Sequence, residues 1–482
     1  MKSLTVKSLL ALILIGLCSF TIYLSKKPVK KHYDEGVNKN QSLNINIKID
    51  DLHPGIQIPN DFLGLSYEIT SLTDSVYFRS NHVKFKNLMA GLGNGVLRLN
   101  GYYGNFVPWG NHERNAIMSK GSNYYLTDSI ATSDLDSVFA FVRPIGWKVI
   151  LGIQLPHSTP ERTHDEVSYA WRKGSDVIKA FEIGNEPEGL YKSNFANYYN
   201  DLSPHISIIK NKLPPNVPIC GPASVHPDLF IAPFINKFYN RVSFITYHDY
   251  PVGENNVKNN VGQLLGNNAV ITAYNKSHFV DSLSRIKNVK YRISECNNYA
   301  DEGSGVADRF ASALWGIDFM FTVAQNNAQG INFHGGGRGF TPISVNKGKV
   351  IEPQPLYYGM LFFHLASQGQ LLPIKSNSSN TAIKAYAVLG KNQTIFLTLL
   401  NKDPYNSATI NIATKSSYGT GKVIQLLAPS VSSKDSITMG GSSINRLGVW
   451  KAKSEETILP QHGSFNINIP AGSATLVTLP RQ

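Results

Sequence analysis

The sequence predicts an α/β protein, a (β/α)8 TIM barrel followed by an accessory C-terminal all-β sandwich domain. Three observations support this prediction. Between residues 59 and 365, eight short β-type segments alternate with longer helical segments. After residue 366, alternating apolar and polar residues form strand-like segments separated by Gly, Ser and Asn turns. At 482 residues, the chain is long enough to bury one large core and a second, smaller one.

The expected barrel strands are apolar runs that end in polar residues. In chain order they are FLGLSYE, GVLRLN, WKVILGIQL, VIKAFEIGNE, VPICGPAS, VSFITYHDY, VKYRISE and GINFHGG. Helical stretches such as residues 193–213 and 305–327 lie between them. A doubly wound open sheet is the competing prediction. The barrel is favoured because no glycine-rich nucleotide loop follows the first strand.

The remaining segments complete the domain organisation. Residues 1–25 contain lysines followed by an apolar run, a pattern that predicts a signal peptide or signal anchor. Residues 26–42 have the composition of a polar linker. Residues 43–58 contain the alternating strand LNINIKI, which we expect to join the β-sandwich. The catalytic barrel then spans 59–365 and the sandwich 366–482. The leader predicts export to the periplasm, the cell surface or the medium, and leaves cleavage, lipidation at Cys18 and anchoring open.

Composition excludes several classes of protein. With 42% apolar and 16% charged residues, the chain is an ordinary globular protein. Much of the net charge of +13 comes from six lysines among the first 33 residues, and no arginine-rich tract or zinc-finger spacing follows, so nucleic-acid binding is not expected. Cys220 and Cys296 are too few for a disulfide framework, and whether they are free or bridged stays open. No residue cluster has metal-ligand spacing, so neither a metal nor a cofactor is expected.

Three glutamates stand at the ends of expected barrel strands: Glu68 after the first, Glu186 after the fourth and Glu295 at the end of the seventh. Functional side chains of a barrel collect at the C-terminal ends of its strands. Two carboxylates facing one cleft suit glycoside hydrolysis, in which one acts as acid and the other as nucleophile or base. Asn185, directly before Glu186, could hydrogen-bond the 2-hydroxyl of the sugar.

Three further charged residues are expected to have lesser roles. Glu182 belongs to the fourth strand and should point away from the sugar, and Glu188 lies beyond Pro187, towards the rim. Arg98, in the second strand, either has a structural role or touches the site, and the sequence leaves that choice open.

Four segments together resemble glycoside hydrolase family 79, which includes microbial exo-β-glucuronidases and the animal heparanases. They are FEIGNEPE, ISECNNY, PQPLYYG and the long stretch GVADRFASALWGIDFMFTVAQNNAQGINFHGGG. The resemblance covers essentially the whole expected barrel. It implies a barrel with a β-sandwich formed from the C-terminus and a preceding N-terminal strand, which agrees with the pattern above.

The resemblance also implies roles for the strand-end residues. Glu186 would be the acid/base and Glu295 the nucleophile. Glu68, in LGLSYE, would bind sugar hydroxyls, and Asn185 would contact the 2-hydroxyl. The carboxyl groups of Glu186 and Glu295 would then lie about 5–5.5 Å apart, as in enzymes that retain anomeric configuration.

Residues from later strands would complete the site in the same way. In TYHDYP, the resemblance implies that Tyr250 holds the nucleophile by a hydroxyl hydrogen bond and that His248 lines the cleft. It implies that the uronate carboxylate is received by the HGGG loop and one tyrosine, namely Gly335, Gly336, Gly337 and Tyr357. Glycine backbone N–H groups can approach a carboxylate closely, and a phenol adds a charge-assisted hydrogen bond.

The expected activity is that of a retaining exo-β-glucuronidase, which releases terminal β-linked glucuronate or its 4-O-methyl ether. The expected partner is a glucuronate-containing oligo- or polysaccharide, with membrane contact only through an N-terminal anchor. Exo action is favoured because the only basic cluster near a strand is residues 287–292. Three alternatives stay open: a heparanase-like endo-β-glucuronidase, a β-xylosidase or β-glucosidase type of retaining barrel enzyme, and a catalytically inactive carbohydrate-binding protein.

Overall fold

The computed structural model describes residues 43–74, 77–111, 129–253, 260–300, 305–336, 339–346 and 349–482. The expected leader and linker, and Gly337 of the glycine loop, lie outside the described residues. Within the described ranges, no helix combines the length and apolar character needed to cross a membrane.

Eight parallel strands close into a barrel, so the prediction of a TIM barrel is confirmed and the open-sheet alternative is wrong. The strands are β2 (Gly64–Glu68), β3 (Val96–Asn100), β6 (Lys148–Ile153), β7 (Ile178–Ile183), β8 (Ile219–Ser224), β9 (Phe244–Asp249), β10 (Lys290–Cys296) and β11 (Ile331–His334). Closure comes from β11, which pairs with both β10 and β2. Seven of the eight expected segments contain one of these strands, and the eighth, VKYRISE, covers β10 except for Cys296.

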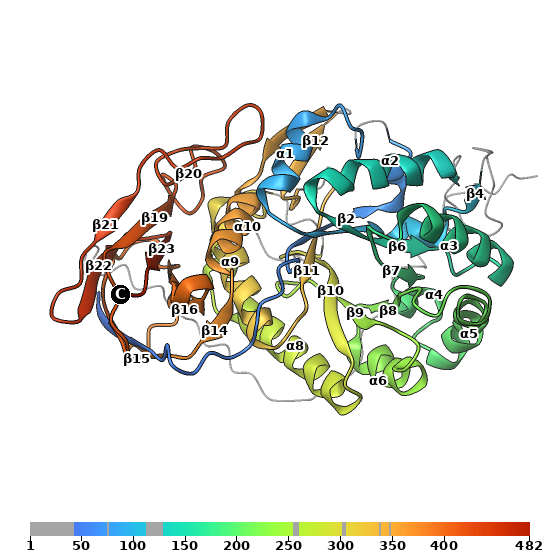
Figure 1. The fold of residues 1–482 in the computed structure, drawn as a ribbon, viewed down its shortest axis with the longest axis horizontal. Helices are drawn as coiled ribbons and strands as arrows, with labels where there is room; N and C mark the ends of the chain where they lie inside the picture. The colour runs from blue at the N-terminus through green and yellow to red at the C-terminus, as the bar shows by residue number, and fades with distance from the viewer. Residues whose placement is uncertain are drawn as a thin grey trace, which may run out of the picture. The chain divides into compact units, whose positions relative to one another are not determined.

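Helices connect successive barrel strands and surround them (Figure 1). They are α1 (Val83–Gly91), α2 (Thr132–Val142), α3 (Pro160–Gly174), α4 (Pro187–Leu190), α5 (Phe195–Lys212), α6 (Pro227–Phe238), α7 (Gly262–Leu265), α8 (Asn268–Ile286), α9 (Phe310–Gln325) and α10 (Pro355–Ala366). Capping side chains explain where two of these helices begin. Thr159 caps α3 just before Pro160, and Asn194 caps α5. Two short pairs, β4 (Trp109–Asn111) with β5 (Ile130–Ala131) and β12 (Ile343–Asn346) with β13 (Lys349–Pro353), lie in barrel loops.

The C-terminal region forms two sheets with a shared apolar core, which confirms the expected β-sandwich. One sheet has the order β15 (Ile374–Ser376), β1 (Leu43–Ile49), β18 (Ala408–Thr414), β22 (Ser464–Ile469). The other contains β14 (Gln370–Leu372), β16 (Ile383–Leu389), β17 (Ile395–Asn401), β23 (Ser473–Leu479), β19 (Gly421–Leu427), β20 (Thr438–Met439) and β21 (Glu456–Ile458). The N-terminal strand β1 pairs in parallel with β18 and so lies inside the sandwich.

A buried ionic contact joins the barrel to the sandwich. Asp318 of α9 accepts a hydrogen bond from Tyr386 of β16, and its other oxygen lies 2.5 Å from Nζ of Lys402, which follows β17. Both members of the ion pair are fully buried. Breaking such a pair leaves a charge in an apolar interior, which costs far more than an exposed pair contributes.

We therefore expect Asp318→Ala to lower the free energy of unfolding by about 3–5 kcal/mol, because Lys402 is left buried without its partner. Urea denaturation followed by tryptophan fluorescence measures this. The matched control is Glu455→Ala, which breaks the exposed pair between Lys422 and Glu455 and should change stability by less than about 0.5 kcal/mol. Equal denaturation midpoints for the two variants would contradict the role given to the buried pair.

Candidate active site

A small pocket opens at the C-terminal ends of the barrel strands. Its volume is about 280 Å³, and it is lined by Glu68, Tyr102, Asn185, Glu186, Val225, Tyr250, Glu295, Ala300, His334 and Phe340. Six of the predicted site residues therefore lie together. Five of them line the pocket directly, and His248 is hydrogen-bonded to one of these five, Glu186. Larger cavities lie among the sandwich strands, but they contain none of these side chains.

Glu186 occupies a strained turn between β7 and α4. Its backbone is left-handed (φ 45°, ψ 65°), a conformation that costs a non-glycine residue about 1–3 kcal/mol. The turn is held by neighbouring strands: Glu186 N donates to the carbonyl of Ala223, and Asn105 bonds both the N–H and the carbonyl of Asn185. The strain is thus compensated by hydrogen bonds that fix where the Glu186 side chain leaves the backbone.

Arg98, at the centre of β3, connects the residues of the site. Its side chain is fully buried, and each of its five N–H donors meets an acceptor. The acceptors are Glu182 (2.6 Å), Ser66 (3.2 Å), Glu295 (2.6 Å), Asn185 (2.7 Å) and His248 Nε2 (3.2 Å). Arg98 thus links β3 to β2, β7, β9 and β10. The open choice for Arg98 is resolved in favour of contact with the site, and Glu182 points inward to support Arg98.

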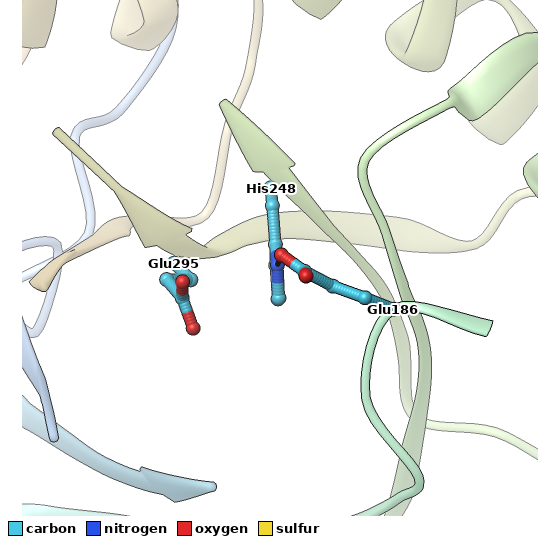
Figure 2. Close-up of side chains that lie close together, drawn as sticks. All are labelled: Glu186, His248 and Glu295. Atoms are coloured by element: carbon cyan, nitrogen blue, oxygen red, sulfur yellow. Dashed lines mark hydrogen bonds and ion pairs between the residues drawn. The ribbon is translucent and has the colours of Figure 1, made fainter. Parts of the chain in front are cut away.

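The contact with Arg98 also decides the tautomer of His248. A guanidinium can only donate, so His248 Nε2 accepts and the ring proton must sit on Nδ1. Nδ1 therefore donates to Glu186 Oε1 across 2.8 Å. Figure 2 shows the Glu186 carboxylate directed at the His248 ring, with Glu295 on the other side of that ring. Oε1 of Glu186 accepts the hydrogen bond from His248, so a proton on the Glu186 carboxyl group belongs on Oε2. The Glu186 side chain as a whole is 34% exposed.

Glu295 is held as an ionised, oriented carboxylate. Tyr250 Oη donates to Oε1 across 2.7 Å and Arg98 donates to Oε2. Burial by itself raises the pKa of Glu295, but several nearby groups, among them His334, Arg98 and the Tyr250 hydroxyl, outweigh burial and hold this pKa well below its usual range. Burial and the charge of Glu295 raise the pKa of Tyr250 well above its usual value, so its hydroxyl stays a donor.

The carboxyl groups of Glu186 and Glu295 lie close together, beside His248. One oxygen from each, together with a nitrogen of His248, all lie within 4.8 Å of one another. This spacing is close to the roughly 5–5.5 Å of retaining glycosidases and well under the 6.5–9.5 Å of inverting ones. The same trio has ligand types that a metal ion accepts. However, both nitrogens of His248 are already hydrogen-bonded, and a cation there would lie beside the Arg98 guanidinium.

Glu68 and His334 form the opposite wall of the pocket. Glu68 Oε2 accepts from the backbone N–H of Tyr103 (3.0 Å), and Oε1 lies 3.8 Å from His334 Nε2. His334 Nδ1 lies 3.7 Å from Glu295 Oε2. His334 ends β11 and was not among the predicted site residues, because the family resemblance pointed to the glycines that follow it. The strand-end rule would have found it.

Two of the residues predicted to receive a uronate carboxylate do not face the pocket, and those predictions are wrong. Tyr357 is buried, and its hydroxyl donates to the carbonyl of Leu88 across 2.6 Å, between α10 and α1. The N–H of Gly335 donates to Ser66 O, as part of the closure of the barrel. Gly336 has a positive φ of 96° and lies over Tyr67. Its role stays a prediction, and Gly337 lies outside the described residues.

The structure corrects one further expectation in the same region, for Glu188, and settles the state of the two cysteines. Glu188 does not reach the rim: it is buried and accepts from Ser224 Oγ and from the N–H of His226. Cys220 and Cys296 are both buried free thiols. Cys296 contacts the carbonyl of Asn332, so its side chain points into the wall, away from the pocket.

Comparison with known protein families identifies the C-terminal domain. Residues 385–476 match the glycosyl hydrolase family 79 C-terminal beta domain. The chain carries the C-terminal β domain of glycoside hydrolase family 79. This match confirms the family resemblance, and with the barrel fold it supports a glycoside hydrolase of this family. A search of curated protein sequences finds no match.

Solved structures share the fold of this chain at low sequence identity. A 4-O-α-L-rhamnosyl-β-D-glucuronidase from Fusarium oxysporum 12S is 16% identical, with a TM-score of 0.71 over 91% of this chain and 100% of that one. An α-L-arabinofuranosidase from Thermotoga maritima is 13% identical, with a TM-score of 0.70 over 90% and 99%. A family 51 arabinofuranosidase from Xanthomonas axonopodis pv. citri is 14% identical, with a TM-score of 0.67 over 91% and 100%. At these identities the likeness establishes the fold.

We expect Tyr250→Phe to shift the acid side of the pH profile of kcat/KM to higher pH. The Tyr250 hydroxyl is one of the groups that lower the pKa of Glu295, so its removal raises that pKa towards the usual value. Glu295 then becomes protonated, and loses its negative charge, at a higher pH than in the wild type. Hydrogen bonds to charged groups contribute about 1.5–3 kcal/mol, so kcat should also fall roughly 10- to 150-fold.

The matched control is Tyr357→Phe, which removes a buried tyrosine hydroxyl that does not face the pocket. Its pH profile and its KM for a glucuronide should equal those of the wild type. An unshifted acid limb in Tyr250→Phe, or a selective rise in KM in Tyr357→Phe, would contradict these placements.

Proposed function

We propose that this protein is a retaining, exo-acting β-glucuronidase, with Glu295 as nucleophile and Glu186 as acid/base. One observation carries the proposed reaction: one oxygen of each carboxyl group lies within 4.8 Å of the other, with one carboxylate held ionised with the help of Arg98 and Tyr250 and the other bonded to His248 Nδ1. The preference for glucuronate rests on the family 79 domain and on the likeness to the Fusarium rhamnosyl-glucuronidase.

The reaction proceeds in two displacements. Glu295 Oε2 or Oε1 attacks the anomeric carbon while the bond to the leaving oxygen breaks and Glu186 Oε2 gives that oxygen its proton. A covalent glycosyl ester on Glu295 results. Glu186, now a base, takes a proton from water, whose oxygen attacks the anomeric carbon and releases Glu295 with the starting configuration restored. The Nδ1–H of His248 stabilises the Glu186 carboxylate whenever it is ionised.

The pocket supports binding of a single terminal sugar. Its volume of about 280 Å³ is just below the roughly 300–1,000 Å³ found for sites that hold drug-sized ligands. Asn185 Oδ1 is taken by Arg98, so its amide N–H groups remain for the sugar's 2-hydroxyl. Glu68 and His334 provide an acceptor and a donor for other ring hydroxyls.

Azide rescue tests the two roles separately. Glu295→Ala should lose at least roughly 10⁴-fold in kcat, and azide, entering the vacated space, should form the glycosyl azide with inverted configuration. Glu186→Ala should keep appreciable activity on aryl glycosides with good leaving groups, and its azide product should have retained configuration. Nuclear magnetic resonance of the two azides gives the configurations. Wild-type-like turnover by Glu295→Ala, or exchanged configurations, would overturn the assignment.

A neutral sugar is a second candidate for the same pocket. Among the described lining residues there is neither Lys nor Arg, and the wall opposite the acid/base carries Glu68. An anionic sugar would meet this carboxylate, and Tyr357 is not available to offset it. A β-xyloside, a β-glucoside or an α-L-arabinofuranoside would meet no such charge.

A panel of four p-nitrophenyl glycosides decides between the two candidates: β-D-glucuronide, β-D-xyloside, β-D-glucoside and α-L-arabinofuranoside. We expect the highest kcat/KM for the glucuronide. A higher value for any neutral glycoside would replace the glucuronidase proposal while keeping the retaining mechanism. No turnover of any of the four by correctly folded protein would favour a carbohydrate-binding protein without catalysis.

A further inference from the structure

The outer face of the four-stranded sheet in the sandwich is unusually polar and regular. Along β1, Ile45, Ile47 and Ile49 are buried in the sandwich core, while Asn44, Asn46 and Lys48 point outward and are exposed. Period-two alternation therefore puts two amides and an ammonium on one solvent-facing surface.

Strand register aligns these side chains into rows across the sheet. Directly paired residues lie on the same face, with Cβ atoms about 4.5–5.5 Å apart. The first row is Asn44, Thr409 and Asn468; the second is Asn46, Asn411 and Asn466; the third is Lys375, Lys48, Ala413 and Ser464. Asn411 donates to Asn466 and Ser464 within this array. The face is thus a flat grid of amides and hydroxyls that ends in two lysines.

Lys48 and Lys375 are directly opposite each other on antiparallel strands. Like charges in this position repel and destabilise the sheet. Within the described part of the chain, neither lysine has an acidic partner. Both line a hollow of about 290 Å³, where the small side chain of Ala413 leaves space, together with Lys415 and Asp50. Asp50 already accepts from Lys415 (2.6 Å) and contacts His53 (3.0 Å), so two positive charges remain uncompensated.

We propose that this face binds a segment of an anionic polysaccharide, with one carboxylate or sulfate group between Lys48 and Lys375. Hydroxyls of neighbouring sugar residues would lie on the asparagine rows, because an amide offers both the donor and the acceptor that a sugar hydroxyl needs. A lipid surface would need apolar side chains beside the cations, and the three rows contain none larger than Ala413. This inference does not depend on the catalytic roles proposed above.

Affinity electrophoresis of the full chain tests this surface with three probes: polygalacturonate, dextran sulfate and neutral dextran. We expect retardation by one or both anionic polymers and none by dextran. Lys48→Ala/Lys375→Ala should bind at least roughly tenfold more weakly, which matches the loss of one or two charge-assisted hydrogen bonds. Polygalacturonate alone would identify a carboxylate as the bound group, and dextran sulfate alone a sulfate.

Two further variants distinguish binding at a specific site from a general effect of the protein's positive charge. Lys451→Ala/Lys453→Ala removes two exposed lysines from the loop between β20 and β21 and should bind as the wild type does. Asn46→Ala changes no charge and should weaken binding several-fold. Turnover of a small aryl glycoside should be unchanged in all variants. The melting temperature should be unchanged in Lys451→Ala/Lys453→Ala and in Asn46→Ala, and it should not fall in Lys48→Ala/Lys375→Ala, since that variant relieves a repulsion.

Three outcomes would overturn the proposal. The first is no retardation by either anionic polymer. The second is an equal loss of binding in the two double-lysine variants, which would make the effect one of net charge. The third is binding to phosphatidylglycerol vesicles, but to neither polysaccharide, which would assign the surface to a membrane.

Discussion

The buried guanidinium of Arg98 is the interaction on which the site depends. It stands inside the barrel, away from solvent, and all five of its donors are used. Burial lowers the pKa of Arg98, but the charges of Glu182 and Glu295 more than offset this and raise the pKa above its usual value. A buried cation is tolerable only when its charge is paired and its donors are satisfied, so Arg98 and its acceptors require one another.

That requirement has chemical consequences. Glu182 supplies a permanent negative charge, which would keep the guanidinium in place while Glu295 loses its charge in the proposed reaction. Arg98 also determines which atoms of its neighbours remain available. It occupies Asn185 Oδ1 and His248 Nε2, which leaves the amide N–H groups of one and the Nδ1–H of the other for their own partners. One side chain thus helps to keep the proposed nucleophile ionised and also determines the hydrogen bond to the proposed acid/base.

The residues of the pocket indicate the type of reaction more fully than they indicate the identity of the sugar. The carboxylate pair and its supports are complete among the described residues, whereas the expected uronate contacts are not: Tyr357 serves helix packing and Gly335 serves strand pairing. A reaction type can be argued from two oriented carboxylates. The identity of the sugar depends on weaker contacts around the ring, several of which come from loops.

The sequence alone determined the architecture and the positions of Glu68, Glu186 and Glu295. Buried parallel strands can be recognised as apolar runs, and the functional residues of a barrel lie at the C-terminal ends of those runs. It also indicated that LNINIKI joins the sandwich. Only the tertiary structure decided which way each side chain points. Arg98, Glu182 and Glu188 are charged residues within or beside strands, and their partners lie up to 197 positions away, so no local pattern reveals them. Tyr357 failed as a prediction for the same reason: a helix position fixes a residue's neighbourhood, but the packing of α10 against α1 decides what its hydroxyl meets.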